Sequence, residues 1–310
     1  MPSTKIIKQR IQSVKNTSQI TKAMEAVSAT KMRRSQGFAL SARPYAVASL
    51  TLLQGLLRRL PESEKLPEVI QPRPVRASCL MIITSDKGLA GALNANVLRR
   101  ADSWIENQKK TGIPFALIAV GKKAKEYCER KGIPAEHVYT GFGDYARLSQ
   151  TRPIADALLA GFRSGRWDEV EAAYTNFRTT LSQQAILEKI LSATEKGLAE
   201  AVAAILPERG RFAYVAEFQK EHHYNYEYVV EPSPAAVLEI LVPQLIRMHI
   251  HHIILESNAS EHSARMVAMK NASESAAELI ETLTLQYNKA RQAGITQELV
   301  EITAGREALA

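Results

Sequence analysis

Apolar positions near the start of the chain follow the spacing of one helical face. They recur in steps of three or four within two groups, first Ile7, Ile11 and Val14, then Ile20, Met24 and Val27. No Gly or Pro interrupts residues 3–36, and such steps place side chains on one side of an α-helix. The predicted seam is narrow, which is typical of a two-helix coiled coil and not of a helix that flanks a globular core.

A longer run of the same kind lies near the C-terminus. Residues 244–293 contain no Gly or Pro, and a helix of these 50 residues extends about 75 Å. Its seam positions alternate in steps of four and three: His262, Met266, Met269, Ser273, Ala276, Ile280, Leu283, Tyr287 and Ala290. After Ala290 the register slips to a new seam at Ile295, Leu299 and Ile302. We expect the two helices to pair antiparallel, with the end of the longer one extending beyond the start of the other.

The middle of the chain has a different pattern. Short apolar runs typical of buried strands cover residues 78–84, 114–120 and 169–177. A helical stretch at 89–110 follows the first run, a charged helix that ends at Arg130 follows the second, and helix-like residues 154–163 precede the third. Strands that alternate with helices predict an open α/β sheet with right-handed crossovers. Four of the 13 prolines fall within residues 60–74, which predicts a linker.

The predicted fold class is therefore α/β plus a long antiparallel α-helical coiled coil. The N- and C-terminal helices, within residues 1–60 and 233–310, form a discontinuous coiled-coil shaft, and a small Rossmann-like open sheet domain (75–232) is inserted between them. Helical periodicity over residues 183–206 predicts an extra helix in the region of about 187–224. Pro243 predicts that the last helix begins after it or kinks there.

Composition and targeting signals narrow the class of protein. No apolar stretch approaches the roughly 18 residues that a membrane span requires, and no apolar signal segment precedes the first helix. We therefore expect a cytoplasmic protein. The two cysteines, Cys79 and Cys128, are far apart and outside any metal-binding spacing, so neither a disulfide nor a zinc site is predicted.

The positive charge is concentrated in the N-terminal helix. Residues 1–43 contain nine basic residues against one acid, Glu25, and this excess accounts for the net charge of +8 of the whole chain. A basic stripe on a helix indicates an acidic partner, and a solvated basic face is the plain structural alternative.

Two other motifs have a structural explanation. Gly88 and Gly91 follow a strand and open a helix, where a phosphate-binding turn would lie, but GLAG lacks the GxGxxG spacing and the chain contains no GxxxxGK[ST] motif. We predict a structural turn and no nucleotide bound by the chain itself. His249 and His252 share a helix face without a third ligand at suitable spacing, so no metal is predicted.

Three segments resemble, in order, the signature segments of the γ subunits of F-type ATP synthases. They are KNTSQITKAMEAVSATKMRR (15–34), TSDKGLAGALNAN (84–96) and EHSARMVAMKNASESAAELIETLTLQYNKARQAGIT (261–296). In that family the paired helices are the central rotor shaft inside a hexamer of α and β subunits. The α/β domain is a foot that rests, with the ε subunit, on the c-ring.

The resemblance implies a mechanical function. The chain would couple proton- or sodium-driven rotation of the c-ring to ATP synthesis and hydrolysis at the β subunits. It would have no catalytic site and no cofactor, because the α and β partners bind the nucleotide, and it would contact no nucleic acid. It would lie at the cytoplasmic face of the bacterial plasma membrane as a peripheral protein, reaching the membrane only through the complex.

The resemblance also implies roles for single residues. Arg291 and Gln292 match a pair that hydrogen-bonds a catalytic subunit, and Thr296 lies one turn further on; an exposed pair at a helix end is the structural alternative. Met24 and Arg265 match positions at which coupling is sensitive, although Met24 also fits a plain seam position.

Further contacts are implied along the shaft and at the foot. The basic side chains expected to face an acidic loop of β are Lys22, Lys31, Arg33 and Arg34. Ile295, Leu299 and Ile302 would be an apolar bearing surface at the tip, unless they pack on another helix. The segment 226–232 resembles the part of the foot that faces the c-ring, which places Tyr226, Tyr228 and Glu231 there.

Two other function classes fit part of the pattern. A nucleic-acid-binding protein would use the basic helix along phosphates, with a steep salt dependence of DNA binding. An α/β enzyme with helical arms would bind a ligand or turn over a substrate in isolation. Neither class explains all three matching segments.

Overall fold

The computed structural model describes residues 4–41, 48–49, 52–53, 55–57, 66–71, 73–192 and 230–308. The chain forms two compact units. The first consists of Met1–Ala29 and Arg265–Ala310, and the second is Thr30–Ala264. Helices α1 (Thr4–Ser41) and α8 (Pro234–Ala308) each contribute to both units.

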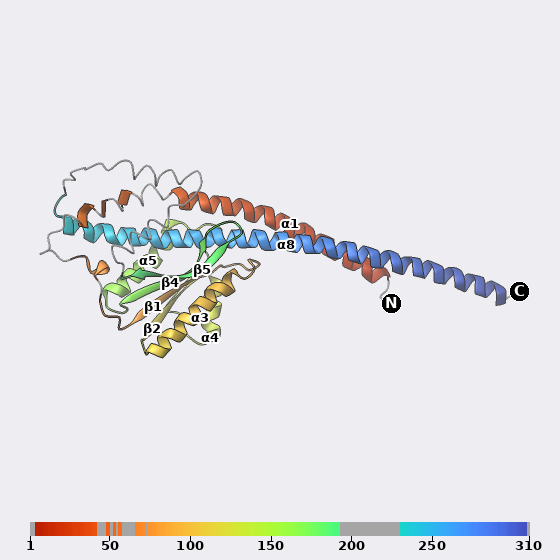
Figure 1. Cartoon of the computed structure of the whole chain (residues 1–310), viewed down its shortest axis with the longest axis horizontal. Helices are drawn as coiled ribbons and strands as arrows, with labels where there is room; N and C mark the ends of the chain where they lie inside the picture. Colours follow the sequence, from red (N-terminus) through yellow and green to blue (C-terminus); the bar gives the residue numbers. More distant parts are fainter. Residues whose placement is uncertain are drawn as a thin grey trace. The chain divides into compact units, whose positions relative to one another are not determined.

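The first unit contains only the N-terminal part of α1 and the C-terminal part of α8. These two segments lie side by side and run antiparallel (Figure 1). The expected pairing of the terminal helices is therefore confirmed. No helix of the described part of the chain is both long enough and apolar enough to cross a membrane.

Helix α8 begins earlier than predicted. The expectation that it starts after Pro243 is wrong, because one helix runs from Pro234 with Pro243 inside it. Pro234 suits a first helical turn, where its missing N–H costs nothing. Pro243 removes one backbone hydrogen bond, but its neighbours Val242 and Leu245 are buried and hold this turn in the core.

The second unit is built on a five-stranded sheet of order β3-β2-β1-β4-β5. The strands are β1 (Ser78–Ile83), β2 (Phe115–Val120), β3 (His137–Tyr139), β4 (Glu169–Phe177) and β5 (Gln183–Leu191). Strand β1 pairs parallel with both β2 and β4, and β2 pairs parallel with β3, whereas β5 is antiparallel to β4. The apolar run Cys79–Ile83 of β1 reflects this central position, because both faces of the strand are buried.

Helices cover both faces of the sheet (Figure 1). On one face Cys79, Met81 and Ile83 belong to a core with α5 (Leu148–Arg163) and the first half of α8. On the other face Leu80 and Ile82 belong to a core with α3 (Leu93–Thr111) and α4 (Lys122–Lys131). The predicted Rossmann-like open sheet is confirmed, and a short 3-10 helix (Glu68–Ile70) precedes it.

The helix predicted over residues 183–206 is wrong in its first part. Gln183–Leu191 is an edge strand that pairs with β4 after a short turn, with one irregularity in register near Ile190. The spacing of Ile186 and Ile190 fits a helix turn and also one face of a strand, so periodicity could not decide between them. Backbone pairing with the open edge of β4 decided it. Residues 193–224 of the region lie outside the described part of the chain.

Candidate functional site

The seam of α1 is an unbroken series of buried and half-buried positions. In steps of four and three it comprises Ile7, Ile11, Val14, Ser18, Thr21, Glu25 and Ser28. The first three were predicted, but Ile20 and Val27 are not part of it, since they are 60% and 51% exposed. The seam continues instead through polar residues, most of them small, which hydrophobicity alone does not reveal.

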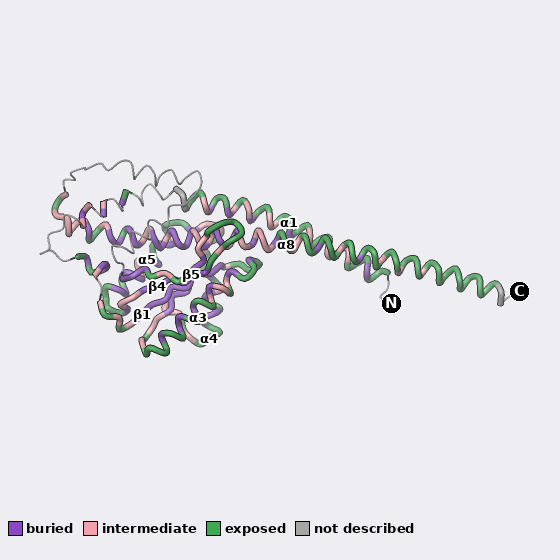
Figure 2. The backbone as a smooth tube through the Cα atoms, viewed as in Figure 1, coloured by how far each residue is buried: buried purple, intermediate pink, exposed green. Residues whose placement is uncertain are grey.

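The seam of α8 agrees with the prediction. Within the first unit, the buried and half-buried positions include Met266, Met269, Ser273, Ala276, Ile280, Leu283, Tyr287 and Ala290. Nearly all intervening residues from Lys270 onward are exposed, so the apolar stripe is narrow (Figure 2). This is the two-in-seven pattern of a helix that has one partner.

One hydrogen bond fixes how the two seams align. The hydroxyl oxygens of Thr21 and Ser273 are 2.6 Å apart. In an antiparallel pair, each step along one helix is matched by an equal step backward along the other. Ile7 therefore lies level with Tyr287, and Val14 with Ile280. Every buried position of one helix then faces a buried position of the other.

The same register explains where the seam ends. The first described residue of α1 is Thr4, which lies level with Ala290, so no described residue of α1 lies opposite the later positions of α8. All described side chains from Ile295 to Arg306 are exposed. Ile295, Leu299 and Ile302 are 51%, 58% and 68% exposed, so they form no further seam with the residues that the structure describes. The end of α8 is exposed along its length (Figure 2).

The pair Arg291 and Gln292 lies at this boundary on α8, and both side chains are exposed. Neither side chain makes a hydrogen bond or an ion pair with the described residues. Thr296 donates from its hydroxyl to the Gln292 carbonyl at 3.0 Å. The guanidinium and the amide are therefore available to an external partner.

The basic residues separate into two groups. Lys22, Arg33 and Arg34 are exposed, and none of them is ion-paired with a described residue. Lys31 differs, because its ammonium lies 2.8 Å from a carboxylate oxygen of Asp144.

The remaining predicted site residues are spread along the chain. Met24 is half-buried on α1, and Arg265 is 6% exposed on α8. Glu231 is exposed just before α8. Tyr226 and Tyr228 lie outside the described residues.

At the carboxyl edge of the sheet, two side chains accept hydrogen bonds from backbone N–H groups. The Asp86 carboxylate accepts hydrogen bonds from the backbone N–H groups of Lys122 (2.9 Å), at the start of α4, and Gly141 (2.8 Å). The Thr84 hydroxyl accepts a third from the Ala124 N–H at 2.7 Å. These three backbone donors, at the start of α4 and after β3, are thus already satisfied within the chain. The sequence analysis did not identify Asp86 as the acceptor of these backbone hydrogen bonds.

Gly121 is required at this turn. Its φ is +94°, and a Cβ atom there would lie 2.2 Å from the Thr84 carbonyl oxygen. The role of this glycine is therefore close backbone approach, not phosphate binding.

A buried group of titratable side chains joins the sheet to the first half of α8. The Tyr174 hydroxyl donates to Glu188 at 2.6 Å, and His249 Nε2 lies 3.2 Å from the other carboxylate oxygen of Glu188. His252 Nε2 lies 3.7 Å from Glu256. Sequence analysis missed both glutamates, because the first was assigned to a helix and the second has no distinguishing local pattern.

The two carboxyl groups have opposite pKa shifts. Burial alone would raise the pKa of Glu188, but the neighbouring His249 and the Tyr174 hydroxyl lower it below its usual value. Burial, with a smaller contribution from the Glu188 charge, raises the pKa of Glu256 to about 8. The described residues contain no cluster of His, Cys, Asp or Glu suited to a metal ion, this group included.

The sequence of the chain matches a known protein family over nearly its whole length. A family model described as ATP synthase matches residues 3–309. The ATP synthase gamma chain of Gloeothece citriformis is 38% identical to the chain, over 100% of both sequences. That of Roseiflexus castenholzii is 41% identical, over 100% of this chain and 99% of the relative.

Solved structures share the fold at low sequence identity. A chain of the Euglena gracilis mitochondrial ATP synthase (OSCP/F1/c-ring) superposes with a TM-score of 0.63 at 16% identity, covering 99% of this chain and 94% of that chain. A chain of the central stalk and c-ring structure from Tetrahymena thermophila gives a TM-score of 0.57 at 22% identity, covering 82% and 99%.

Proposed function

The chain belongs to the ATP synthase family, and from this we propose that it is the central rotor shaft, the γ subunit, of an F1Fo ATP synthase. It couples proton- or sodium-driven rotation of the c-ring to ATP synthesis and hydrolysis at the β subunits. Its partners are the α and β subunits, the ε subunit and the c-ring. The carrying observation is the narrow antiparallel seam of the first unit, which ends at Ala290 and leaves residues 295–306 exposed.

This seam suits a mechanical element. Two helices in one fixed register resist bending and twisting better than one helix, because each seam side chain is held between residues of the partner. A rotating shaft transmits work if it contacts each β subunit differently at each angle, since a partner changes conformation only when it binds one state better. The chain itself has no catalytic site in this proposal.

The exposed residues have separate roles in the proposal. Arg291, Gln292 and Thr296 form a directional contact with one β subunit, because a guanidinium beside an amide binds a carboxylate and a carbonyl together. Lys22, Arg33 and Arg34 attract an acidic loop of β through exposed ion pairs, each worth about 0–1 kcal/mol, weak enough to break at every turn. Met24 and Arg265 lie where coupling is sensitive.

The two ends of the shaft complete the proposal. Ile295, Leu299 and Ile302 turn as an apolar bearing inside the collar of the hexamer. The sheet domain is the foot, and the segment with Tyr226, Tyr228 and Glu231 faces the c-ring.

The boundaries 1–60 with 233–310 for the shaft and 75–232 for the foot remain predictions. The complex lies at the cytoplasmic face of the bacterial plasma membrane, and nucleotide is bound by the α and β subunits and not by this chain.

Reconstitution tests the proposal. The chain is mixed with the α and β subunits of the same source, and ATP hydrolysis is measured with and without it. We expect no hydrolysis by the chain alone, a large gain in the complex, and a loss of coupling or assembly with Arg291→Ala and Gln292→Ala combined. A wild-type chain that neither assembles nor changes the rate would refute the rotor role. Unchanged coupling in the double variant would remove only the role of this pair.

A further inference from the structure

The loop that joins β3 to α5 contacts three separate segments of the second unit through Asp144. One carboxylate oxygen lies 2.8 Å from the Lys31 ammonium on α1, and the other lies 3.3 Å from the Lys87 ammonium in the loop after β1. The Asp144 carbonyl oxygen lies 3.0 Å from His262 Nε2 on α8. One residue thus joins α1, α8 and the carboxyl edge of the sheet.

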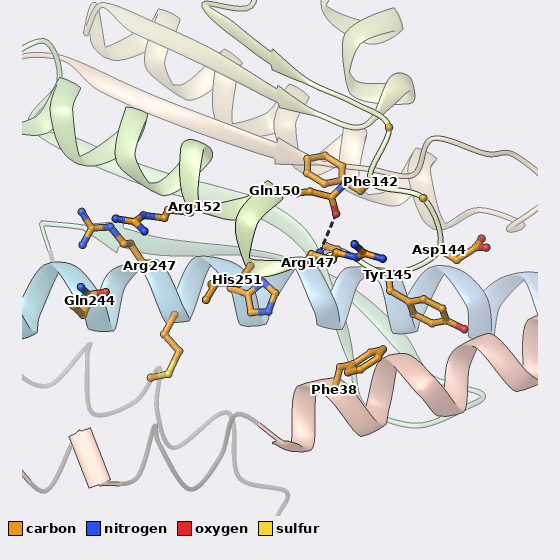
Figure 3. Close-up of a pocket in the computed structure, with 15 residues that line it drawn as sticks. Phe38, Phe142, Asp144, Tyr145, Arg147, Gln150, Arg152, Gln244, Arg247 and His251 are labelled. Atoms are coloured by element: carbon orange, nitrogen blue, oxygen red, sulfur yellow. Dashed lines mark hydrogen bonds between the residues drawn. The ribbon is translucent and has the colours of Figure 1, made fainter.

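The next residue of the loop adds aromatic contacts to the same helices. The rings of Tyr145 and Phe38 meet edge to face, with centroids 5.6 Å apart, and Phe38 points from α1 toward Tyr145 (Figure 3). The Tyr145 and His262 rings are 6.3 Å apart. Lys31 and Phe38 are seven residues apart, so they lie on one face of α1 and contact adjacent residues of the loop, Asp144 and Tyr145.

The loop is itself fixed to the sheet. The Gly141 N–H donates to the Asp86 carboxylate, which also accepts from the first residue of α4. Gly141 and Gly143 have positive φ angles of 83° and 69°, which shape the turn, and Ala146 is buried in the core. Because the loop is fixed to the sheet on both sides of Asp144, a force applied to Asp144 is transmitted to the ends of the strands.

The charges around Asp144 keep its ion pair with Lys31 formed at physiological pH. Lys31 holds the pKa of Asp144 below its usual value, with Lys87 acting in the same direction. The carboxylate is therefore ionised throughout the physiological range. The Asp144 side chain is 33% exposed, so the ion pair contributes to the position of α1 more than to folding.

We propose that Asp144 is a positioning residue that locks α1, through Lys31, onto the sheet unit, so that torque passes between helix and foot. This inference rests on the proposed rotor function. It gives Lys31 a role inside the chain, in place of the contact with an acidic loop of β that the family resemblance implied. Tyr145 and Phe38 maintain the angle of the same joint.

A coupling measurement on the assembled complex tests this joint. F1Fo complexes carrying each variant are inserted in membrane vesicles, and ATP hydrolysis and the number of coupling ions, protons or sodium, pumped per ATP are measured separately. We expect Asp144→Asn and Lys31→Met each to lower the pumping ratio about two- to fivefold while hydrolysis continues. Asp144→Glu should retain most of the ratio. Assembly is checked by gel filtration.

The double variant separates the joint from the alternative role of Lys31. If Lys31 acts on Asp144, combining Lys31→Met with Asp144→Asn lowers the ratio no further than either change alone. Additive losses, or a normal ratio in Asp144→Asn, would overturn the joint and return Lys31 to a partner contact. Should Asp144→Asn not assemble, Lys31→Met and Lys31→Arg test the same ion pair.

The matched control is Asp102→Asn. Asp102 makes a comparable pair, 2.6 Å from Lys131 and 2.7 Å from the Tyr127 hydroxyl, but it joins α3 to α4 on the opposite face of the sheet. It should leave the pumping ratio unchanged, and an equal loss there would show that any weakened ion pair in the domain uncouples the complex. A wild-type complex without coupled pumping would instead count against the rotor function itself.

Discussion

The hydroxyl groups of Thr21 on α1 and Ser273 on α8 are hydrogen-bonded at 2.6 Å across the seam of the two helices. Both sites are seam positions that an ordinary coiled coil would fill with Leu or Ile. A polar pair at such a position favours one register, because any slip leaves two hydroxyl groups buried without each other. We infer that this bond sets the alignment from which the rest of the seam follows.

Removing one hydroxyl at this site should destabilise the helix pair. Thr21→Val leaves the half-buried Ser273 hydroxyl without this partner, and we expect it to cost about 1 kcal/mol. Ser273→Ala should cost less, because the Thr21 hydroxyl keeps its bond to the Ser18 carbonyl at 3.0 Å. The combined variant should cost less than the sum, because no unpaired hydroxyl remains. Thermal unfolding followed by helical circular dichroism measures both effects, and strictly additive losses would show that the two groups do not interact.

Truncation of a leucine should destabilise the chain before Ala290 and have almost no effect after it. Leu283 is 9% exposed in the seam, and Leu283→Ala should lower the stability of the chain by about 2–3 kcal/mol. Leu299 is 58% exposed, so Leu299→Ala should stay within about 0.5 kcal/mol of the wild type. Denaturant unfolding of the isolated chain measures both. Similar losses would mean that the C-terminal segment packs on the chain itself.

The carboxyl group of Glu256 should make stability fall as pH rises. Its pKa is about 8 in the folded chain against 4.5 for the free group, so the folded state retains a proton that the unfolded state has lost. Across this window the loss is on the order of 2–4 kcal/mol, and it is complete above pH 8. His252 lies on the same helix, and Glu188, His249 and Tyr174 complete the surrounding group.

Glu256→Gln should remove most of this slope and stabilise the chain at pH 8 relative to the wild type. Chemical unfolding at pH 5, 6.5 and 8 measures the slope. Glu278→Gln is the control, because that side chain is exposed on α8 and should leave the slope unchanged. An unaltered slope in Glu256→Gln would assign the titration to another group.

Addition of one methyl group at Gly121 should damage the fold. The Cβ of Gly121→Ala would lie 2.2 Å from the Thr84 carbonyl oxygen at a φ of +94°, so the strand ends must separate. We expect a loss of about 3 kcal/mol in urea unfolding. Gly88→Ala, which meets no atom within 4 Å, should change stability by no more than about 0.5 kcal/mol.

The sequence alone determined the helices and strands that bury a regular series of hydrophobic side chains. The spacing from Met266 to Ala290 predicted the seam of α8, and the apolar runs predicted β1, β2 and β4, because each of these segments buries apolar side chains at a single period. The positive charge of the N-terminal helix was equally visible. So was the absence of a phosphate-binding motif.

Tertiary structure decided the features that depend on a partner segment. Ser18, Thr21 and Ser28 occupy the seam of α1 because α8 faces them, although Ile20 and Val27 are more hydrophobic. Strand β5 forms because β4 offers an open edge. Asp86 and Asp144 act through backbone and charged groups far away in the sequence, and no local pattern records a bond between residues that only folding brings together.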